Sequence, residues 1–373
     1  MFKHARSLFD IPSDISYLNC AAQSPLLHAT KVGGDAGIAI KSHPWTLDPE
    51  VWDRGADELR NFFAELIGAK GQDIALIPST AYGVATAAAN LSLEKGQNIV
   101  LLEGQFPSNV IAWENMAVEN EGEIAEVSRP DDYDWTPHVL KAITEQTAIA
   151  ALPPCHWTDG SKLDLIAIGA RCREVGAALV VDATQAVGAM ELDVDAIQPD
   201  FLMASGYKWL LSSIGSAYLY AAPKRQKGRA IEQSMFNCVG RDSVSGLYTA
   251  KKDALRYDMG GRNNFILQSM ALKSLRQINE WGPGNIQRQL TPLTDLVAEL
   301  ALDRGWRVPG KDNRIGHIIG ITFPNGRSAN LQKKLASENV FVSERGEGLR
   351  ISPYLYNNRK DIEKFFEVMD SLV

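Results

Sequence analysis

Short, mainly apolar runs recur along the middle of the chain. They are Ile99–Leu102, Ile149–Leu152, Ala177–Val181, Phe201–Ala204 and Ser216–Tyr220. Runs of this length are typical of strands that are buried on both faces of a sheet. The stretches between them, such as Asp164–Val175, have apolar positions at helical spacing. This alternation of strand and helix predicts a mostly parallel sheet that is covered by helices on both sides.

The pattern changes near residues 265–285. Ile266–Glu280 has the spacing of a long helix, and the sequence Trp281-Gly-Pro-Gly284 ends it. Further along, the pattern predicts strands and helices of a smaller α+β unit. The strands are His317–Phe323 and Gly348–Ser352, and the helices are Ser328–Asn339 and Lys360–Leu372. We therefore expect a large domain over residues 16–265, a connecting helix over residues 266–284, and a small domain made of residues 1–15 and 285–373.

Length and composition support this division. The chain has 373 residues, which is more than the roughly 250–300 residues at which a single core stops growing. Hydrophobic residues make up 45% and charged residues 22%, as in ordinary globular domains, so intrinsic disorder is excluded. The net charge of −7 argues against general binding to nucleic acids or other polyanions.

Neither a membrane segment nor a metal site is expected. No stretch has the roughly 20 apolar residues that span a bilayer, and residues 1–17 lack the apolar region of a signal peptide. The four cysteines, Cys20, Cys155, Cys172 and Cys238, are scattered without a CxxC pair. His156 has no histidine or cysteine partner at ligand spacing. These features predict free thiols, no metal and a cytoplasmic location.

Polar residues follow two of the predicted strands, where open α/β sheets bind their ligands. Asp182 comes at the end of one strand, and Gln185 follows three residues later. Lys208 lies just beyond the next strand. Each also has an ordinary interpretation, because an aspartate there caps a helix and a lysine there reaches the surface.

Small hydroxyl residues, Ser79 and Thr80, precede an alanine-rich helical stretch. Such residues cap helices, and the free N–H groups of a helix start also bind phosphate. A lysine, an acid and a phosphate cradle are together what pyridoxal 5′-phosphate (PLP) requires. The acid keeps the pyridine nitrogen protonated, and the lysine can move the Cα proton of a substrate.

These motifs resemble those of the class V aminotransferase family of PLP-dependent enzymes, which includes cysteine desulfurases and isopenicillin N epimerase-like proteins. The matching segments are Tyr17–Ala22 (YLNCAA), Ser79-Thr80, Asp182–Gln185, Ser205–Lys208 and Leu349–Asn357. The resemblance implies the aspartate-aminotransferase fold, which is fold type I of the PLP-dependent transferases. It also implies a large domain with a mostly parallel sheet of the seven-stranded type and a small α+β C-terminal domain.

The resemblance assigns roles to individual residues. Lys208 is expected to form the aldimine with PLP, Asp182 to pair with the pyridinium nitrogen, and Gln185 to approach the phenolic oxygen. Phe106 would stack on the cofactor where desulfurases typically have a histidine, although ordinary core packing is the alternative. The phosphate would be held by Thr80, the backbone of Ala81, Ser205 and Tyr207.

The substrate and a partner subunit are also implied. Arg350 matches the arginine that binds the substrate carboxylate, although a surface arginine is the alternative, and Asn19 would lie near the substrate. The segment that contains Asn264 resembles one that reaches into the other subunit's site. The resemblance therefore implies a homodimer with shared active sites.

The reaction is less closely indicated. Desulfurases carry a nucleophilic cysteine shortly before the arginine that matches Arg350, but Phe341–Gly348 contains none, and a thiolate is the nucleophile that takes sulfur from a thiol. We therefore expect an aminotransferase that acts on a small amino acid or amine. A PLP-dependent lyase or epimerase is the alternative. A non-catalytic binding protein would not need Lys208, Asp182 and Arg350 together.

Overall fold

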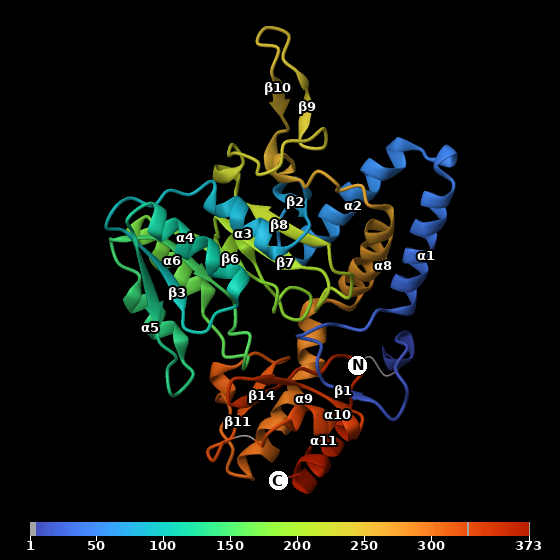
Figure 1. Cartoon of the computed structure of the whole chain (residues 1–373), viewed down its shortest axis with the longest axis vertical. Helices are drawn as coiled ribbons and strands as arrows, with labels where there is room; N and C mark the ends of the chain where they lie inside the picture. The colour runs from blue at the N-terminus through green and yellow to red at the C-terminus, as the bar shows by residue number, and fades with distance from the viewer. Residues whose placement is uncertain (1–4, 327, 373) are drawn as a thin grey trace.

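The computed structural model describes residues 5–326 and 328–372 (Figure 1). Its central element is a sheet of seven strands in the order β2-β8-β7-β6-β5-β3-β4. Neighbouring strands are parallel except around β8, which is antiparallel to both β2 and β7. The strands are β2 (Ile74–Ile77), β3 (Asn98–Leu102), β4 (Glu123–Val127), β5 (Thr147–Leu152), β6 (Ala178–Asp182), β7 (Phe201–Ser205) and β8 (Ala217–Ala221). The predicted α/β class and mostly parallel sheet are confirmed.

Both faces of this sheet are buried, which explains the uninterrupted apolar runs. In β6, Val180 packs into the core on one face and Val181 into the core on the other. Successive side chains of a strand point to opposite faces, so both sets must be apolar. The five predicted runs form β3, β5, β6, β7 and β8.

Helices cover the two faces. One face packs against α3 (Thr80–Ala88) and α4 (Ile111–Glu119). The other face is covered by α2 (Pro49–Ile67), α5 (Trp135–Ala142), α6 (Leu165–Val175) and α8 (Phe265–Trp281). The short helix α7 (Val194–Ile197) precedes β7.

Helix α1 (His28–Ser42) packs closely on α8 (Figure 1). A Cβ atom at Gly33 or Gly37 would lie 2.5 or 2.6 Å from a backbone oxygen of α8. Glycine is therefore required for the two helix backbones to approach so closely.

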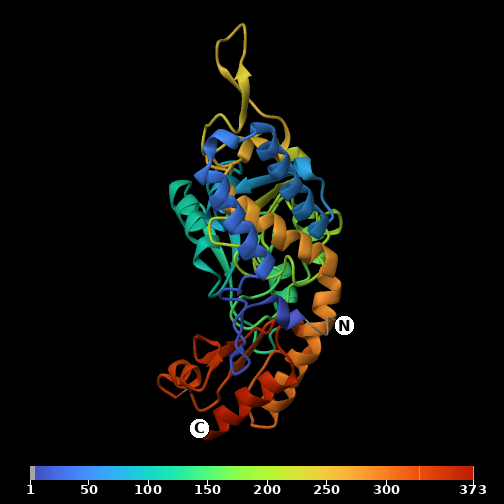
Figure 2. The ribbon, with the colours of Figure 1, turned by 90° about the vertical axis from the view of Figure 1, so that its right-hand side faces the viewer.

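The predicted long helix is α8, and Gly282, with φ of 76°, ends it. A second helix, α9 (Pro283–Leu302), starts immediately afterwards, and the sequence pattern did not indicate it. Figure 2 shows α8 and α9 running in succession from the large sheet towards the C-terminal elements. The two helices thus connect the two parts of the chain.

The C-terminal part contains a three-stranded antiparallel sheet in the order β11-β14-β13. Its strands are β11 (Ile319–Thr322), β13 (Ser343–Arg345) and β14 (Gly348–Ile351). Helices α9, α10 (Leu331–Ser337) and α11 (Arg359–Leu372) share a core with it. The strand β1 (Ser16–Tyr17) pairs in parallel with β12 (Val340–Phe341). The domain boundaries stay a prediction.

One hairpin stands apart from both parts. Strands β9 (Cys238–Arg241) and β10 (Tyr248–Ala250) project from the far end of the molecule (Figure 1). None of the helices within the described ranges is both long and apolar enough to cross a membrane.

Candidate active site

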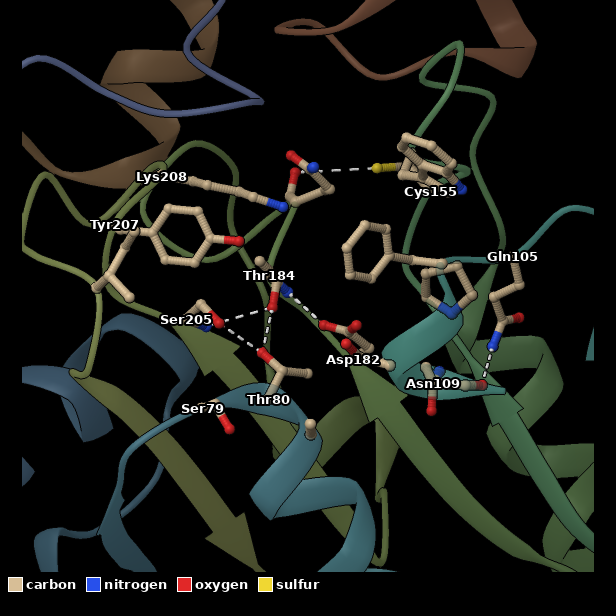
Figure 3. Close-up of a pocket in the computed structure, with 17 residues that line it drawn as sticks. Ser79, Thr80, Gln105, Asn109, Cys155, Asp182, Thr184, Ser205, Tyr207 and Lys208 are labelled. Atoms are coloured by element: carbon tan, nitrogen blue, oxygen red, sulfur yellow. Dashed lines mark hydrogen bonds between the residues drawn. The ribbon is translucent and has the colours of Figure 1, made fainter. Parts of the chain in front are cut away.

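A cavity of about 310 Å³ lies at the carboxyl ends of the parallel strands (Figure 3). Its wall is formed by the start of α3 and by the segments that follow β3, β5, β6 and β7. This is the edge at which open α/β sheets bind ligands. Of the predicted cofactor-binding residues, the wall contains Lys208, Asp182, Gln185, Thr80, Ala81, Ser205, Tyr207 and Phe106. The structure thus brings together all of them except Asn264.

Lys208 supplies an amine to this cavity. It is 6% exposed, and its Nζ lies 5.2 Å from the ring centroid of Phe106 and 5.4 Å from that of Tyr207. Burial lowers the pKa of Lys208 to about 8, although the nearby Asp182 carboxylate acts in the opposite direction. A larger share of neutral amine is present than at a surface lysine, which favours nucleophilic attack. The alternative of a surface lysine is excluded.

Asp182 is the last residue of β6 and is 8% exposed. Its Oδ1 accepts a hydrogen bond from the backbone N–H of Thr184 at 3.0 Å. Burial raises the pKa of Asp182, while Thr184 and Lys208 act to lower it. A carboxylate in such a place gains most from a cationic partner, such as a protonated ring nitrogen.

Three hydroxyl groups form a cluster at the start of α3 (Figure 3). Thr80 Oγ1 lies 2.6 Å from Ser205 Oγ and 3.0 Å from Thr184 Oγ1. Ser79 caps α3, and its Oγ accepts a hydrogen bond from the N–H of Tyr82 at 3.2 Å. The first N–H groups of an α-helix have no acceptor within the helix, so they and the hydroxyls suit a phosphate. Thr184 was missed by the sequence analysis.

Both ends of the Gln185 amide are hydrogen-bonded, one to the backbone and one to a side chain. Its Nε2 donates to the carbonyl oxygen of Ala21 at 3.0 Å, and its Oε1 accepts from Trp209 Nε1 at 2.8 Å. The N–H of Ala21 in turn donates to Ser352 Oγ at 3.0 Å, next to the end of β14. Because an amide nitrogen has two donors, one N–H of Gln185 is left for a ligand.

Aromatic rings border the cavity. Phe106 is 36% exposed, so ordinary core packing does not describe it. Its ring meets Trp157 edge-on, with centroids 5.4 Å apart and an interplanar angle of 81°. His156, in contrast, is fully buried and stacks on Trp135 at 5.3 Å. Burial lowers the pKa of His156 to about 4.

Arg350 and Asn19 lie outside the residues that line the cavity. Arg350 is 1% exposed, which excludes the alternative of a surface arginine. Its Nη1 donates to the carbonyl oxygen of Trp157 at 2.8 Å, so a cavity residue connects it to the site. Burial lowers the pKa of Arg350 to about 9. Asn19 Oδ1 accepts a hydrogen bond from Ser343 Oγ at 2.6 Å.

The thiol on the cavity wall is that of Cys155, whereas Cys20, in the Tyr17–Ala22 segment, is not among the residues that line the cavity. Both side chains are fully buried, and burial raises the pKa of each thiol. Both are therefore protonated near neutral pH. Within residues 5–326 and 328–372, no group of three His, Cys, Asp or Glu side chains could hold a metal ion.

Asn264 does not reach the cavity of its own chain. It is exposed, and its Oδ1 caps α8 by accepting a hydrogen bond from the N–H of Leu267 at 3.1 Å. A role for Asn264 in the site of a partner subunit stays a prediction.

Comparisons with known proteins agree with this geometry. The family model described as Aminotransferase class-V matches residues 52–365. Isopenicillin N epimerase of Streptomyces clavuligerus is 25% identical over 335 residues, which cover 84% of this chain and 84% of the epimerase. The uncharacterized aminotransferase YcbU of Bacillus subtilis (strain 168) is 24% identical over 304 residues, which cover 81% of this chain and 80% of YcbU. The apo structure of the cysteine desulfurase of Thermococcus onnurineus NA1 has the same fold, with a TM-score of 0.87, 19% identity, and coverage of 100% of this chain and 98% of the desulfurase.

Proposed function

The chain belongs to the class-V aminotransferase family of PLP-dependent enzymes, and from that premise we propose that it transfers the amino group of a small amino acid or amine to an oxo acid. The observation that carries the proposal is the set of ionisable groups around Lys208. These groups leave Lys208 as the one amine of the cavity wall that can accept and release a proton near neutral pH. Amino-group transfer requires such a base.

The donor groups of the cavity fit PLP. Thr80, Ser205 and the start of α3 would hold its phosphate, and Asp182 would pair with its ring nitrogen. Lys208 would bind its aldehyde carbon, and the ring of Phe106 would contact its face. When bound, PLP supplies an electron-accepting ring that stabilises negative charge on the Cα atom of a substrate.

The residues of the site would have separate roles in the reaction. Asp182 holds a proton on the ring nitrogen, because a buried carboxylate without a cation is unfavourable. Lys208 would carry the proton from the substrate Cα to the aldehyde carbon of PLP, which is the net proton movement that amino-group transfer needs. Arg350 binds the substrate carboxylate, since a guanidinium presents paired N–H groups to both oxygens. Phe106 and Trp157 exclude water from the reacting atoms.

Neighbouring groups are poor competitors of Lys208 as the base. The ionisable side chains in the wall, besides Lys208 and Asp182, are those of Cys155 and Tyr207. Burial raises the pKa of both, so they keep their protons near neutral pH. The side chain of Phe106 has no ionisable proton. Amino-group transfer needs one base on one face of the cofactor, and Lys208 is the group in the wall that suits this role.

The same site is unsuited to desulfuration. The segment before Arg350 is a tight β13–β14 hairpin, and Ser343 in it is hydrogen-bonded to Asn19. A serine hydroxyl cannot replace a thiolate, and burial keeps the thiol of Cys155 protonated.

The test is a single-turnover experiment on the holoenzyme. A panel of amino acids is mixed with the enzyme in the absence of an oxo acid, and the released oxo acid is quantified. We expect one oxo acid per active site, and continuous turnover after an oxo acid acceptor is added. The Lys208→Ala variant, which should fold normally, is the control that gives neither. Racemised or eliminated products without stoichiometric oxo acid would contradict amino-group transfer and favour a lyase or epimerase.

A further inference from the structure

Two arginine side chains share one face of the β13–β14 hairpin. The pairing places Ser343 opposite Arg350, and Arg345 opposite Gly348. Because side chains alternate along a strand and paired residues point to the same side, Arg345 and Arg350 lie on the same face. The glycine opposite Arg345 leaves that part of the face free of a competing side chain.

Both guanidinium groups lie against the ring of Trp157. The guanidinium carbon of Arg345 is 5.0 Å from the ring centroid, and that of Arg350 is 5.9 Å from it. Trp157 lines the cavity and contacts Phe106. The two positive charges are therefore held at the border of the proposed active site by the same aromatic ring.

Neither arginine has a carboxylate to balance its charge among residues 5–326 and 328–372. Nε and Nη2 of Arg350 and Nε of Arg345 are buried without a hydrogen-bond partner. Nη1 of Arg350 donates to the backbone carbonyl of Trp157, and Nη1 of Arg345 donates to that of Glu344.

Other buried arginines of the molecule are paired with acids. Arg60 binds Asp258 through two hydrogen bonds of 2.9 and 2.6 Å, and Arg262 binds Asp53 at 2.6 Å. Burying a charge without a partner costs several kcal/mol, as a general estimate. Two neighbouring guanidinium groups without acids therefore mark a place that is built for anions.

We propose that Arg345 is a specificity-determining residue, and that Arg345 and Arg350 together recognise an amino acid that carries a second acid group on its side chain. This inference rests on the proposed function. Arg350, the more deeply buried of the two, binds the α-carboxylate, and Arg345, which is half-buried at the border, binds the side-chain acid. One carboxylate would balance only one of the two charges. The positive charges also act on one another, because Arg345 lowers the pKa of Arg350, and both lower that of Lys208.

The experiment compares matched donors on the holoenzyme. The pairs are glutamate with glutamine, aspartate with asparagine, and O-phosphoserine with serine, so that each pair differs mainly in charge and distinguishes a carboxylate from a phosphate. We expect at least one acidic donor to have a kcat/KM above that of its neutral partner by about 10- to 100-fold, the range for a hydrogen bond to a charged group. Arg345→Met should bring this ratio close to one, because it should lower kcat/KM for the acidic donor far more than for its neutral partner. Arg345→Lys should retain part of it, since a lysine keeps the charge but loses the paired N–H groups.

A binding measurement separates this inference from the reaction. Glutarate and succinate, which cannot react, should bind the wild-type holoenzyme more tightly than butyrate in calorimetry, and Arg345→Met should abolish the difference. Arg359→Met, on the exposed side of α11, is the control that should change neither assay. If no oxo acid is formed but diacids still bind through Arg345, the proposed reaction fails and the inference stands. The inference is overturned if no acidic ligand is preferred, or if Arg345→Met weakens acidic and neutral ligands alike.

Discussion

Replacing Lys208 by methionine should stabilise the cofactor-free protein near neutral pH. Methionine has a similar length and no charge. The pKa of Lys208 falls from its ordinary value of 10.5 to about 8 because burial removes water from the ammonium group. This difference corresponds to roughly 3 kcal/mol of free energy of unfolding that the wild-type protein loses while the buried amine stays charged. Asp182 loses an attractive partner in the variant, which reduces the expected gain to about 1–3 kcal/mol.

The sign of the pH dependence follows from which state binds the proton. Between about pH 8 and 10.5, the unfolded chain keeps the lysine protonated and the folded chain does not. The free energy of unfolding of the wild-type protein therefore rises with pH across this window, and Lys208→Met lacks this contribution. The two proteins should differ most below pH 8 and become similar as the pH approaches 10.5.

Urea unfolding, monitored by circular dichroism near pH 7 and near pH 10, measures the difference in free energy of unfolding between the two cofactor-free proteins. The comparison requires that the slopes of the two transitions agree. Lys333→Met is the control, because Lys333 is exposed on α10 and should show neither the gain nor the pH dependence. A Lys208→Met variant that is no more stable than the wild type near neutral pH, or a gain that does not change with pH, would refute the reasoning.

Three further predictions concern the site. Asp182→Asn should retain the cofactor but lower kcat by about 10- to 100-fold, because an amide cannot keep the ring nitrogen protonated. Cofactor absorbance and steady-state kinetics measure the two effects. A near-normal kcat would mean that Asp182 only shapes the turn after β6. Inactive Lys208→Ala and Asn264→Ala chains, when mixed, should regain part of the activity in hybrid dimers, whereas a protein that sediments as a monomer would contradict shared sites. Cys20→Ser should have no large effect on kcat, and L-cysteine should release no sulfide; rapid sulfide release that depends on Cys20 or Cys155 would instead indicate a desulfurase.

The strands of the large sheet that the sequence revealed have both faces buried, whereas the equally buried edge strand β2 is only four residues long and was not predicted. The edge strand β4 has only Val127 fully buried, and Glu123 and Glu126 face the solvent, so it lacks an apolar run. Helix α9 was missed because it contains Pro292 and follows directly after Gly282, both of which indicate a break. Local patterns therefore predict the centre of the sheet well and its edges poorly.

The site shows a similar division. Asp182 and Lys208 were found because each directly follows a recognisable strand, and chain order alone brings such positions to one edge of the sheet. Cys155 and Trp157 follow the predicted strand β5, but their position on the wall depends on the path of the loop. Arg345 required knowledge of the β13–β14 pairing, which no local pattern gives.

The peptide of Ala21 has a mechanical consequence. Its N–H is bonded to Ser352 at the end of β14, and its carbonyl oxygen to the Gln185 amide on the cavity wall. A swing of the C-terminal sheet towards a bound substrate would pull directly on the wall unless one of these bonds breaks. The segment around Ala21 thus links the C-terminal sheet to the cavity wall like a tie rod. A displacement of β14 would be transmitted through it to Gln185, so a substitution near Ala21 should alter the cofactor site without contacting any ligand.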